Sequence, residues 1–392
     1  MRQIVFGLPV VLSALVVAGA CAPSNEAPNT GGHVVPSNGG SGATGGTGAT
    51  AGSTSSGGAA ATGGTSGAAG STVGGASGTG GDGNISGSGG SSGSAGSGGG
   101  TGGPKPSAGC GKPAIQELGN YVAHTVAITG ATLGEPDTHM SREIWVRLPA
   151  NYDPNTPYRV VYQTVGCGAS GTSGYPLWEE GQGGDPNAIY VGLSRPDPPP
   201  DPPSMSTCYD NRGGVDSIEW ESLEKDHYFV RDNFCVDENK VYTGGYSSGG
   251  WMSNMYGCYF GGIDPARVFM PDVALRGALA VAGCWIDGNP PCSTQPVARI
   301  WVHDELDMAP NAYSCATEQR DRSLGQNGCT GGADGPTEVW EVPDGECVKY
   351  TACPAEYPVI FCTTQGRGHG ASNDIAIPEF TKMMQEIEAL TP

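Results

Sequence analysis

The stretch of sequence that decides the fold runs from residue 240 to residue 254 and reads KVYTGGYSSGGWMSN. Residues 240–244 combine β-branched and aromatic side chains and predict a strand, and the apolar run 248–260 predicts a helix. Between them, residues 245–249 fit the pattern Gly-x-Ser-x-Gly, in which a sharp strand-to-helix turn lifts the serine hydroxyl above the sheet. The glycines leave room for neighbouring backbone. Ser247 is therefore the candidate nucleophile of the chain.

The same five-residue pattern occurs a second time, around Ser91. Residues 89–93 lie inside a Gly-rich tract, where no strand-like run precedes the serine and no helix-like run follows it. The bare pattern therefore has little weight in a glycine-rich chain. The strand-then-helix setting is what distinguishes Ser247.

The C-terminal part of the chain alternates strand-like and helix-like segments. Strands are expected at 121–128, 142–148, 159–165, 188–193, 240–244, 275–281, 298–303, 338–342 and 358–363. Helices are expected at 217–234, 248–259, 317–324 and 377–390. Several strands are continuous β-branched runs, and the alternation predicts an α/β fold with a mostly parallel central sheet and helices on both faces. The proline-rich run 195–203 is expected to be a surface loop.

The N-terminal part of the chain has the features of an export signal followed by a tether. Arg2 precedes an apolar stretch, 4–17, which is shorter than the roughly 20 residues of a membrane-spanning helix. Small residues then lead into Cys21, as in a bacterial lipobox, which predicts lipidation of that cysteine; an ordinary signal peptide with an incidental cysteine is the alternative interpretation. Residues 22–108 are mostly Gly, Ser, Thr and Ala and predict a disordered tether. The expected plan is a lipoprotein-type signal peptide at 1–21, the tether at 22–108 and one catalytic domain at 109–392.

The cysteines support export. There are 13 of them, and all except Cys21 lie in the expected C-terminal domain, which leaves an even number, as a disulfide framework requires. Disulfides persist outside the reducing cytosol, so we expect a cell-envelope lipoprotein at the outer membrane or cell surface, or a secreted protein. Zinc is the competing interpretation, but no Cys-x-x-Cys pair is present and no metal site is expected. The sequence leaves the pairing open.

The chain is strongly acidic, with a formal net charge of −20. Only Glu26, Asp82 and Lys105 are charged between residues 22 and 108, so the acidity belongs to the C-terminal domain. An acidic surface repels nucleic-acid phosphates and anionic lipids. Nucleic acid is therefore not an expected partner, and contact with a membrane is expected through the lipid anchor alone.

A serine nucleophile needs a histidine base and an acid that orients the base. His303 and His369 are the histidines that follow Ser247. His369 lies on a Gly-rich segment between the last expected strand and the last expected helix, which favours it as the base, whereas His303 ends an apolar strand and is expected to be structural. For the acid, Asp307 on the loop after that strand is favoured over Asp304, with Asp304 and Glu305 read as solvated loop charges.

Two backbone N–H groups are candidates for the oxyanion hole. One belongs to Ser248, directly after the nucleophile. The other belongs to Cys167 in the turn Gly166-Cys167-Gly168, which follows the expected strand at 159–165. A plain glycine turn that holds a disulfide cysteine is the alternative interpretation of this segment.

At these residues the sequence resembles the feruloyl esterase and polyhydroxybutyrate depolymerase group of secreted α/β-hydrolases, from about Ile144 to Phe380. The strongest block is residues 235–254. The group commonly shows His-Gly-Cys-Gly at the oxyanion loop and His-Gly-x-x-Asp near the acid. This chain has Val165 in place of the histidine of the first pattern and Asp304 in place of the glycine of the second pattern. The second pattern aligns the acid of the group with Asp307.

The resemblance implies an α/β-hydrolase fold and a serine carboxylesterase without a metal or organic cofactor. Its expected substrates are hydroxycinnamoyl or acetyl esters of polysaccharide, or an aliphatic polyester such as polyhydroxybutyrate. Tyr246 and Trp251, beside the nucleophile, are candidate residues of an aromatic-tolerant acyl pocket, with core packing as the alternative. The competing functional hypothesis is a catalytically inactive surface lipoprotein that binds a polymer or a partner, since acidity, tether and disulfides fit it equally well.

Overall fold

The computed structural model describes residues 103–129, 140–169, 183–197, 208–209, 217–284, 292–308 and 311–390. The predicted signal peptide, Cys21, the pattern around Ser91 and nearly all of the predicted tether lie outside these residues. The described residues all belong to the unit Ser92–Pro392.

Ten strands form one sheet in the spatial order β1-β2-β4-β3-β5-β6-β7-β10-β9-β8. Their bounds are β1 Tyr121–Ile128, β2 Met140–Arg147, β3 Tyr158–Thr164, β4 Ile189–Asp197, β5 Val236–Tyr246, β6 Gly277–Val281, β7 Ala298–Asp304, β8 Thr337–Val342, β9 Gly345–Tyr350 and β10 Val359–Thr364. The six neighbouring strands from β4 to β10 run parallel, and antiparallel strands extend the sheet at both ends. The predicted mostly parallel sheet is confirmed.

The central strands are buried on both faces, as their β-branched sequences predict. Every residue of β6 and β7 is buried, and β3 has a single half-buried position. Gly245 near the end of β5 lies opposite Thr164 of β3 and Ala280 of β6. Loops that leave the carboxyl ends of these parallel strands therefore emerge at the same edge of the sheet.

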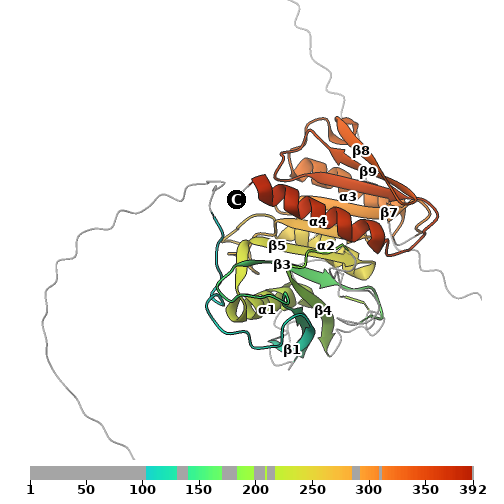
Figure 1. The fold of residues 1–392 in the computed structure, drawn as a ribbon. Helices are drawn as coiled ribbons and strands as arrows, with labels where there is room; N and C mark the ends of the chain where they lie inside the picture. Colours follow the sequence, from blue (N-terminus) through green and yellow to red (C-terminus); the bar gives the residue numbers. More distant parts are fainter. Residues whose placement is uncertain are drawn as a thin grey trace, which may run out of the picture. The chain divides into compact units, whose positions relative to one another are not determined.

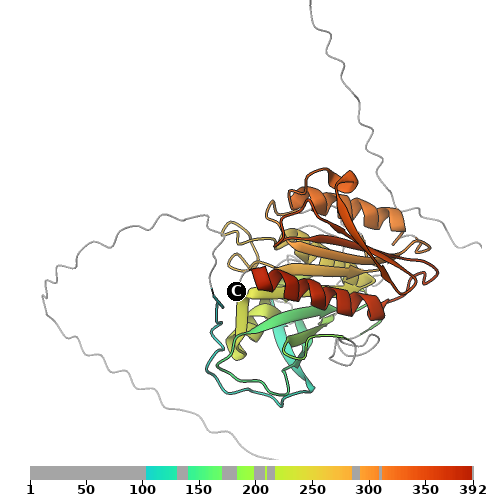
Figure 2. The same ribbon diagram turned by 45° about the horizontal axis from the view of Figure 1, so that its top comes forward.

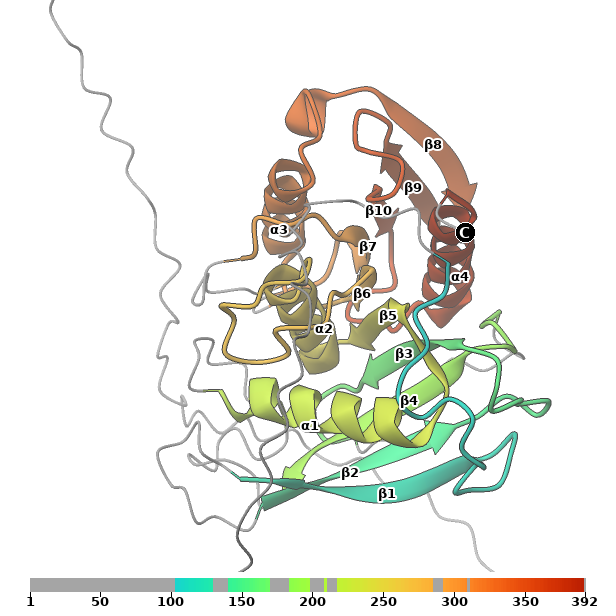
Figure 3. The same ribbon diagram turned by 90° about the vertical axis from the view of Figure 1, so that its left-hand side faces the viewer.

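Helices cover both faces of the sheet. They are α1 Ile218–Asn233, α2 Ser248–Tyr259, α3 Tyr313–Gln326 and α4 Asn373–Leu390, with a short 3-10 helix η4 Gly332–Asp334. Figure 3 shows α1, α2 and α3 on one face and α4 on the other, and α4 lies across the sheet in Figures 1 and 2. The apolar side of α4 packs on the buried side chains of β6 and β7. Among the described residues, no helix combines the length and apolar character needed to cross a bilayer.

The observed elements differ most from the expected ones at strand β9 and in the proline-rich run; β5, α3 and α4 also begin four residues earlier than expected. Strand β9 was not expected, because its six residues include Glu346 and Lys349 and form no apolar run; it forms by pairing between β8 and β10. Strand β4 continues into the proline-rich run as far as Asp197, so the start of that run is not a loop. The pairing with β3 ends at Leu193, and a strand with one partner tolerates the missing N–H of Pro196.

All twelve cysteines of the C-terminal part form disulfides. The pairs are Cys110–Cys235, Cys167–Cys208, Cys258–Cys292, Cys284–Cys315, Cys329–Cys353 and Cys347–Cys362. The pair Cys347–Cys362 joins directly opposed positions of β9 and β10. The predicted disulfide framework is confirmed, and it fits a protein that works in an oxidising compartment.

Candidate active site

The nucleophile turn, residues 245–249, connects β5 to α2 at the carboxyl edge of the sheet. Ser247 has φ 56° and ψ −122°, a backbone conformation that costs a non-glycine residue about 1–3 kcal/mol. The turn is held on both sides, because Ser247 N donates to Val281 O at 2.9 Å and Trp251 N donates to Ser247 O at 3.0 Å. The predicted sharp strand-to-helix turn is present at Ser247, and its backbone is strained.

The two glycines of the pattern are required by close packing against the end of β3. A Cβ on Gly245 would lie 2.1 Å from Thr164 Oγ1, and a Cβ on Gly249 would lie 2.2 Å from Thr164 O. The hydroxyl of Thr164 also donates to Gly249 O at 2.6 Å. Any side chain at either position would push the turn away from β3.

The structure brings Ser247, His369 and Asp307 into one hydrogen-bonded chain. His369 Nε2 lies 2.9 Å from Ser247 Oγ, and His369 Nδ1 lies 3.0 Å and 3.1 Å from the two Asp307 carboxylate oxygens. The Asp307 side chain is 2% exposed, whereas the His369 ring is 40% exposed. In the arrangement that satisfies these contacts, Nδ1–H donates to Asp307 and Nε2 accepts the proton of Ser247.

The loop that carries His369, residues 365–370, follows β10 and is here called the histidine loop. Tyr246 Oη donates to His369 O at 2.5 Å, and the Tyr246 ring lies 5.3 Å from the His369 ring. Arg367 extends a guanidinium to the carboxylates of Asp344 and Asp374. Polar contacts with Tyr246, Asp344 and Asp374 therefore fix this loop.

Asp304 binds the histidine loop through the backbone of Arg367 and not through His369. Its carboxylate accepts hydrogen bonds from Arg367 N at 2.8 Å, Thr364 Oγ1 at 2.9 Å and Leu306 N at 2.9 Å. Burial raises the pKa of Asp304, but these hydrogen bonds outweigh burial and leave the pKa below its ordinary value. The expectation that Asp304 is a solvated charge is wrong, because its side chain is buried among these donors. Glu305 is exposed, as expected.

His303 lies behind the acid. Its Nε2 donates to Asn311 O at 2.6 Å and lies 3.5 Å from Asp307 Oδ2. Burial lowers the pKa of His303 and so favours the neutral ring. His303 therefore contacts Asn311 and Asp307 and not Ser247, which agrees with the structural role expected for it.

The two predicted pocket residues make supporting contacts. Trp251 Nε1 donates to Asn311 Oδ1, and Asn311 is the residue that also accepts from His303. Trp251 thereby connects α2 to the loop of the acid, and Tyr246 connects β5 to the histidine loop. Both side chains are half-buried, and their contribution to an acyl pocket stays a prediction.

The two predicted oxyanion donors belong to segments that adjoin Ser247. Ser248 begins α2, and the amino end of a helix favours negative charge. A Cβ on Gly166 would lie 3.5 Å from Ser247 Cβ and 3.2 Å from the Tyr246 ring, so the turn that holds Cys167 borders the nucleophile. Cys167 is exposed and forms a disulfide with Cys208.

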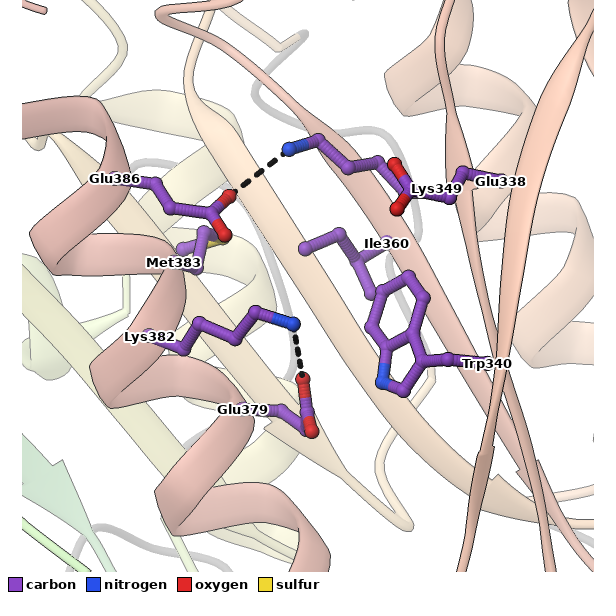
Figure 4. Close-up of a pocket in the computed structure, with 8 residues that line it drawn as sticks. All are labelled: Glu338, Trp340, Lys349, Ile360, Glu379, Lys382, Met383 and Glu386. Atoms are coloured by element: carbon purple, nitrogen blue, oxygen red, sulfur yellow. Dashed lines mark hydrogen bonds and ion pairs between the residues drawn. The ribbon is translucent and has the colours of Figure 1, made fainter.

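Two cavities of the described residues lie away from this site. One lies between α4 and the β8–β9 hairpin, where Lys382 sits over the Trp340 ring (Figure 4). The other, of about 480 Å³, lies near the amino ends of the parallel strands and includes Arg159 and Lys240. Neither is lined by Ser247, Asp307 or His369. Within the described ranges, no group of three or more His, Cys, Asp and Glu side chains is arranged to hold a metal ion.

A strained serine turn after the fifth strand of a largely parallel sheet, with an aspartate and a histidine on later loops, defines an α/β-hydrolase fold. No family model matches the sequence. The sequence is similar to those of feruloyl esterases: feruloyl esterase D of Neurospora crassa is 28% identical over 282 residues, which cover 69% of this chain and 84% of the relative. Feruloyl esterase C of Emericella nidulans is 25% identical over 241 residues, covering 59% of this chain and 77% of that relative.

Among solved structures, an acetyl xylan esterase from Aspergillus awamori aligns with 66% of this chain and 99% of its own, at 15% identity and a TM-score of 0.46. The resemblance to feruloyl esterases is confirmed by the sequence relatives. These relatives do not support the polyester half of the expectation.

Proposed function

We propose that this chain hydrolyses carboxylic esters through an acyl-enzyme on Ser247. The contact that carries the proposal is the 2.9 Å separation between Ser247 Oγ and His369 Nε2, continued by the 3.0 Å contact between His369 Nδ1 and Asp307. A serine hydroxyl is a weak nucleophile until a base takes its proton, and this contact supports His369 as that base.

In the acylation step, Ser247 Oγ attacks the ester carbonyl carbon while His369 Nε2 takes the hydroxyl proton. Asp307 holds the ring in orientation and stabilises the imidazolium. The carbonyl electron pair moves to its oxygen, where the N–H groups of Ser248 and Cys167 stabilise the negative charge. Each such donor is typically worth about 3–4 kcal/mol of barrier.

Collapse of the tetrahedral intermediate breaks the bond to the alcohol, which leaves with the proton from His369. A water molecule then attacks the acyl carbonyl, gives its proton to His369 and completes a second tetrahedral intermediate. Collapse of that intermediate returns the proton to Ser247 Oγ and releases the carboxylic acid. One water is consumed, and one acid and one alcohol are formed.

The substrates we propose are hydroxycinnamoyl or acetyl esters carried by a polysaccharide. The feruloyl esterase relatives support the hydroxycinnamoyl class. A panel of methyl ferulate, acetylated xylan and polyhydroxybutyrate separates the acyl classes when initial rates are compared at equal ester concentration. We expect the highest rate on methyl ferulate. Equal inactivity on all three, together with no labelling of Ser247 by a fluorophosphonate, would favour a polymer-binding protein without catalysis.

We also propose that lipidated Cys21 and the tether of residues 22–108 hold the enzyme at the cell envelope. The proposal predicts that the wild-type protein enters the detergent phase on Triton X-114 partition and that Cys21→Ala stays in the aqueous phase. Aqueous partition of the wild type would indicate a freely secreted protein.

A further inference from the structure

Cys208 and Tyr209 lie beside the nucleophile turn without belonging to any helix or strand. Tyr209 is 1% exposed and packs among the buried residues on the α1 and α2 side of the sheet. Its ring lies 5.9 Å from the guanidinium carbon of Arg142, which is itself buried and paired with Glu219 and Asp226. The phenol therefore has little freedom to move.

The Tyr209 hydroxyl fixes the strand end that leads into the Cys167 turn. It accepts the N–H of Val165 at 3.0 Å and donates to Leu193 O at 2.5 Å. The hydroxyl thus accepts from the residue that follows β3 and donates to the middle of β4, where the pairing of β4 with β3 ends. Because Val165 is two residues before Cys167, this pair of bonds sets where the turn leaves the sheet.

The backbone of the same residue fixes the other side of the oxyanion hole. Tyr209 N donates to Ser248 Oγ at 3.1 Å, so the first residue of α2 is bound through its side chain. Cys208 adds a covalent link, because it is disulfide-bonded to Cys167. Two adjacent residues thus contact both segments that carry the proposed oxyanion donors.

We propose that Cys208 and Tyr209 form an oxyanion clamp, which keeps the N–H groups of Ser248 and Cys167 at the spacing that the tetrahedral intermediate requires. Tyr209 is a positioning residue in this proposal, since it acts on the substrate through the two donors. The inference rests on the proposed function. A tyrosine that merely filled the core would need neither the contact with Ser248 nor the hydroxyl bonds to Val165 and Leu193.

The test uses Tyr209→Phe in the full-length protein, with Tyr152→Phe as the matched control. Tyr152 is also buried, and its hydroxyl also accepts a backbone N–H, that of Cys235, at 2.8 Å. Three quantities are measured for each protein: kcat and KM on p-nitrophenyl acetate, the Ki of a trifluoromethyl ketone, and Tm. The ketone forms a tetrahedral adduct with the serine and so reports on the oxyanion hole directly.

We expect Tyr209→Phe to lower kcat about 10- to 100-fold with KM nearly unchanged, less than the loss of a whole donor. The Ki of the ketone should rise by the same factor. Tyr152→Phe should lower Tm to a similar extent and leave kcat and Ki at the wild-type values. Unchanged kcat and Ki in Tyr209→Phe would overturn the clamp, as would equal losses in both variants.

A second pair of variants tests the covalent half. Replacing Cys167 and Cys208 together by serine keeps the backbone N–H of residue 167, and replacing Cys329 and Cys353 together removes a disulfide away from the site. Both double variants should have a lower Tm than the wild type. Only the variant at Cys167 and Cys208 should raise the Ki of the ketone. If the wild type hydrolyses esters and Ser247→Ala abolishes this activity, the proposed function is supported. The result for Tyr209→Phe then tests the oxyanion clamp alone. An inactive wild type would overturn both.

Discussion

The nucleophile turn and the histidine loop hold the two ends of the same hydrogen-bonded chain, but they are fixed by different forces. Backbone packed at van der Waals distance fixes the turn, where a single added methyl group on Gly245 or Gly249 would overlap Thr164. Hydrogen bonds to the buried Asp304 carboxylate and ion pairs of Arg367 at the surface fix the histidine loop. Close packing resists salt and pH, whereas charged contacts do not. Ser247 is therefore held mainly by packing, and His369 is held mainly by polar contacts that salt or pH can weaken.

The largest expected effect separates strain from chemistry at Ser247. Ser247→Ala and Ser247→Gly should each lower kcat by about 10⁴- to 10⁶-fold, because both lack the nucleophile. Ser247→Gly should also be more stable than Ser247→Ala by about 1–2 kcal/mol, since glycine adopts φ 56° without strain. Ester hydrolysis and chemical denaturation measure the two quantities. Equal stability of the two variants would show that the turn is not strained.

Asp307→Asn should lower kcat by about 10⁴-fold while the fold stays intact. An asparagine amide presents a donor toward His369 Nδ1 in place of the carboxylate, which favours the tautomer that cannot accept the Ser247 proton. Steady-state kinetics give the loss, and circular dichroism checks the fold. Substantial activity in this variant would point to a different acid.

Gly249→Ala tests the packed half of the comparison. The new methyl group would lie 2.2 Å from the backbone of Thr164, so we expect a loss of about 3 kcal/mol or more in the free energy of unfolding. The matched control is Gly325→Ala in α3, where a Cβ meets nothing within 4 Å and alanine should stabilise the helix by about 0.5–1 kcal/mol. Denaturant titration compares them, and similar stabilities would contradict the packing argument.

Asp304→Asn tests the polar half and carries a pH dependence. Its carboxylate has a lowered pKa in the folded protein, so its contribution to stability is present above its ordinary value of 3.8 and is lost as pH falls below it. We expect about tenfold lower kcat at neutral pH from a looser histidine loop. We also expect the Tm of Asp304→Asn to fall less than the Tm of the wild type between about pH 5 and pH 3. Glu305→Gln, next to it and exposed, serves as the control and should behave as the wild type in both measurements.

The smallest expected effect is that of Arg367→Gln. Its partners Asp344 and Asp374 are more than half exposed, and ion pairs of this kind contribute at most about 1 kcal/mol. We expect kcat to fall a few-fold at low salt and the difference from wild type to shrink near 1 M salt. Arg320→Gln, a cation with similar exposure on α3, is the control. A loss that salt does not change would mean that Arg367 acts by packing.

Local sequence predicted the packed half of this comparison better than the polar half. The strand before Ser247, the helix after it and the glycines at 245 and 249 all follow from residues adjacent in the chain. Asp304 and Tyr209 act through partners far away in the sequence, at separations of 60 and 39 residues, so no local pattern indicates them. Strand β9 and the start of α4 at Asn373, ahead of Pro378, likewise depend on what they pack against.

The pairing of the cysteines sets a demand on how the chain matures. In the order in which cysteines occur along the chain, Cys167–Cys208 is the one pair of the six that joins consecutive cysteines. Cys110 can pair correctly only after Cys235, 125 residues later, has emerged, and two other cysteines emerge between them. A chain oxidised as it emerges from a translocation channel pairs neighbours first, and wrong pairs are exchanged only by thiolate attack. Recovery of this protein from an oxidising compartment should therefore depend on a disulfide isomerase more than on an oxidant.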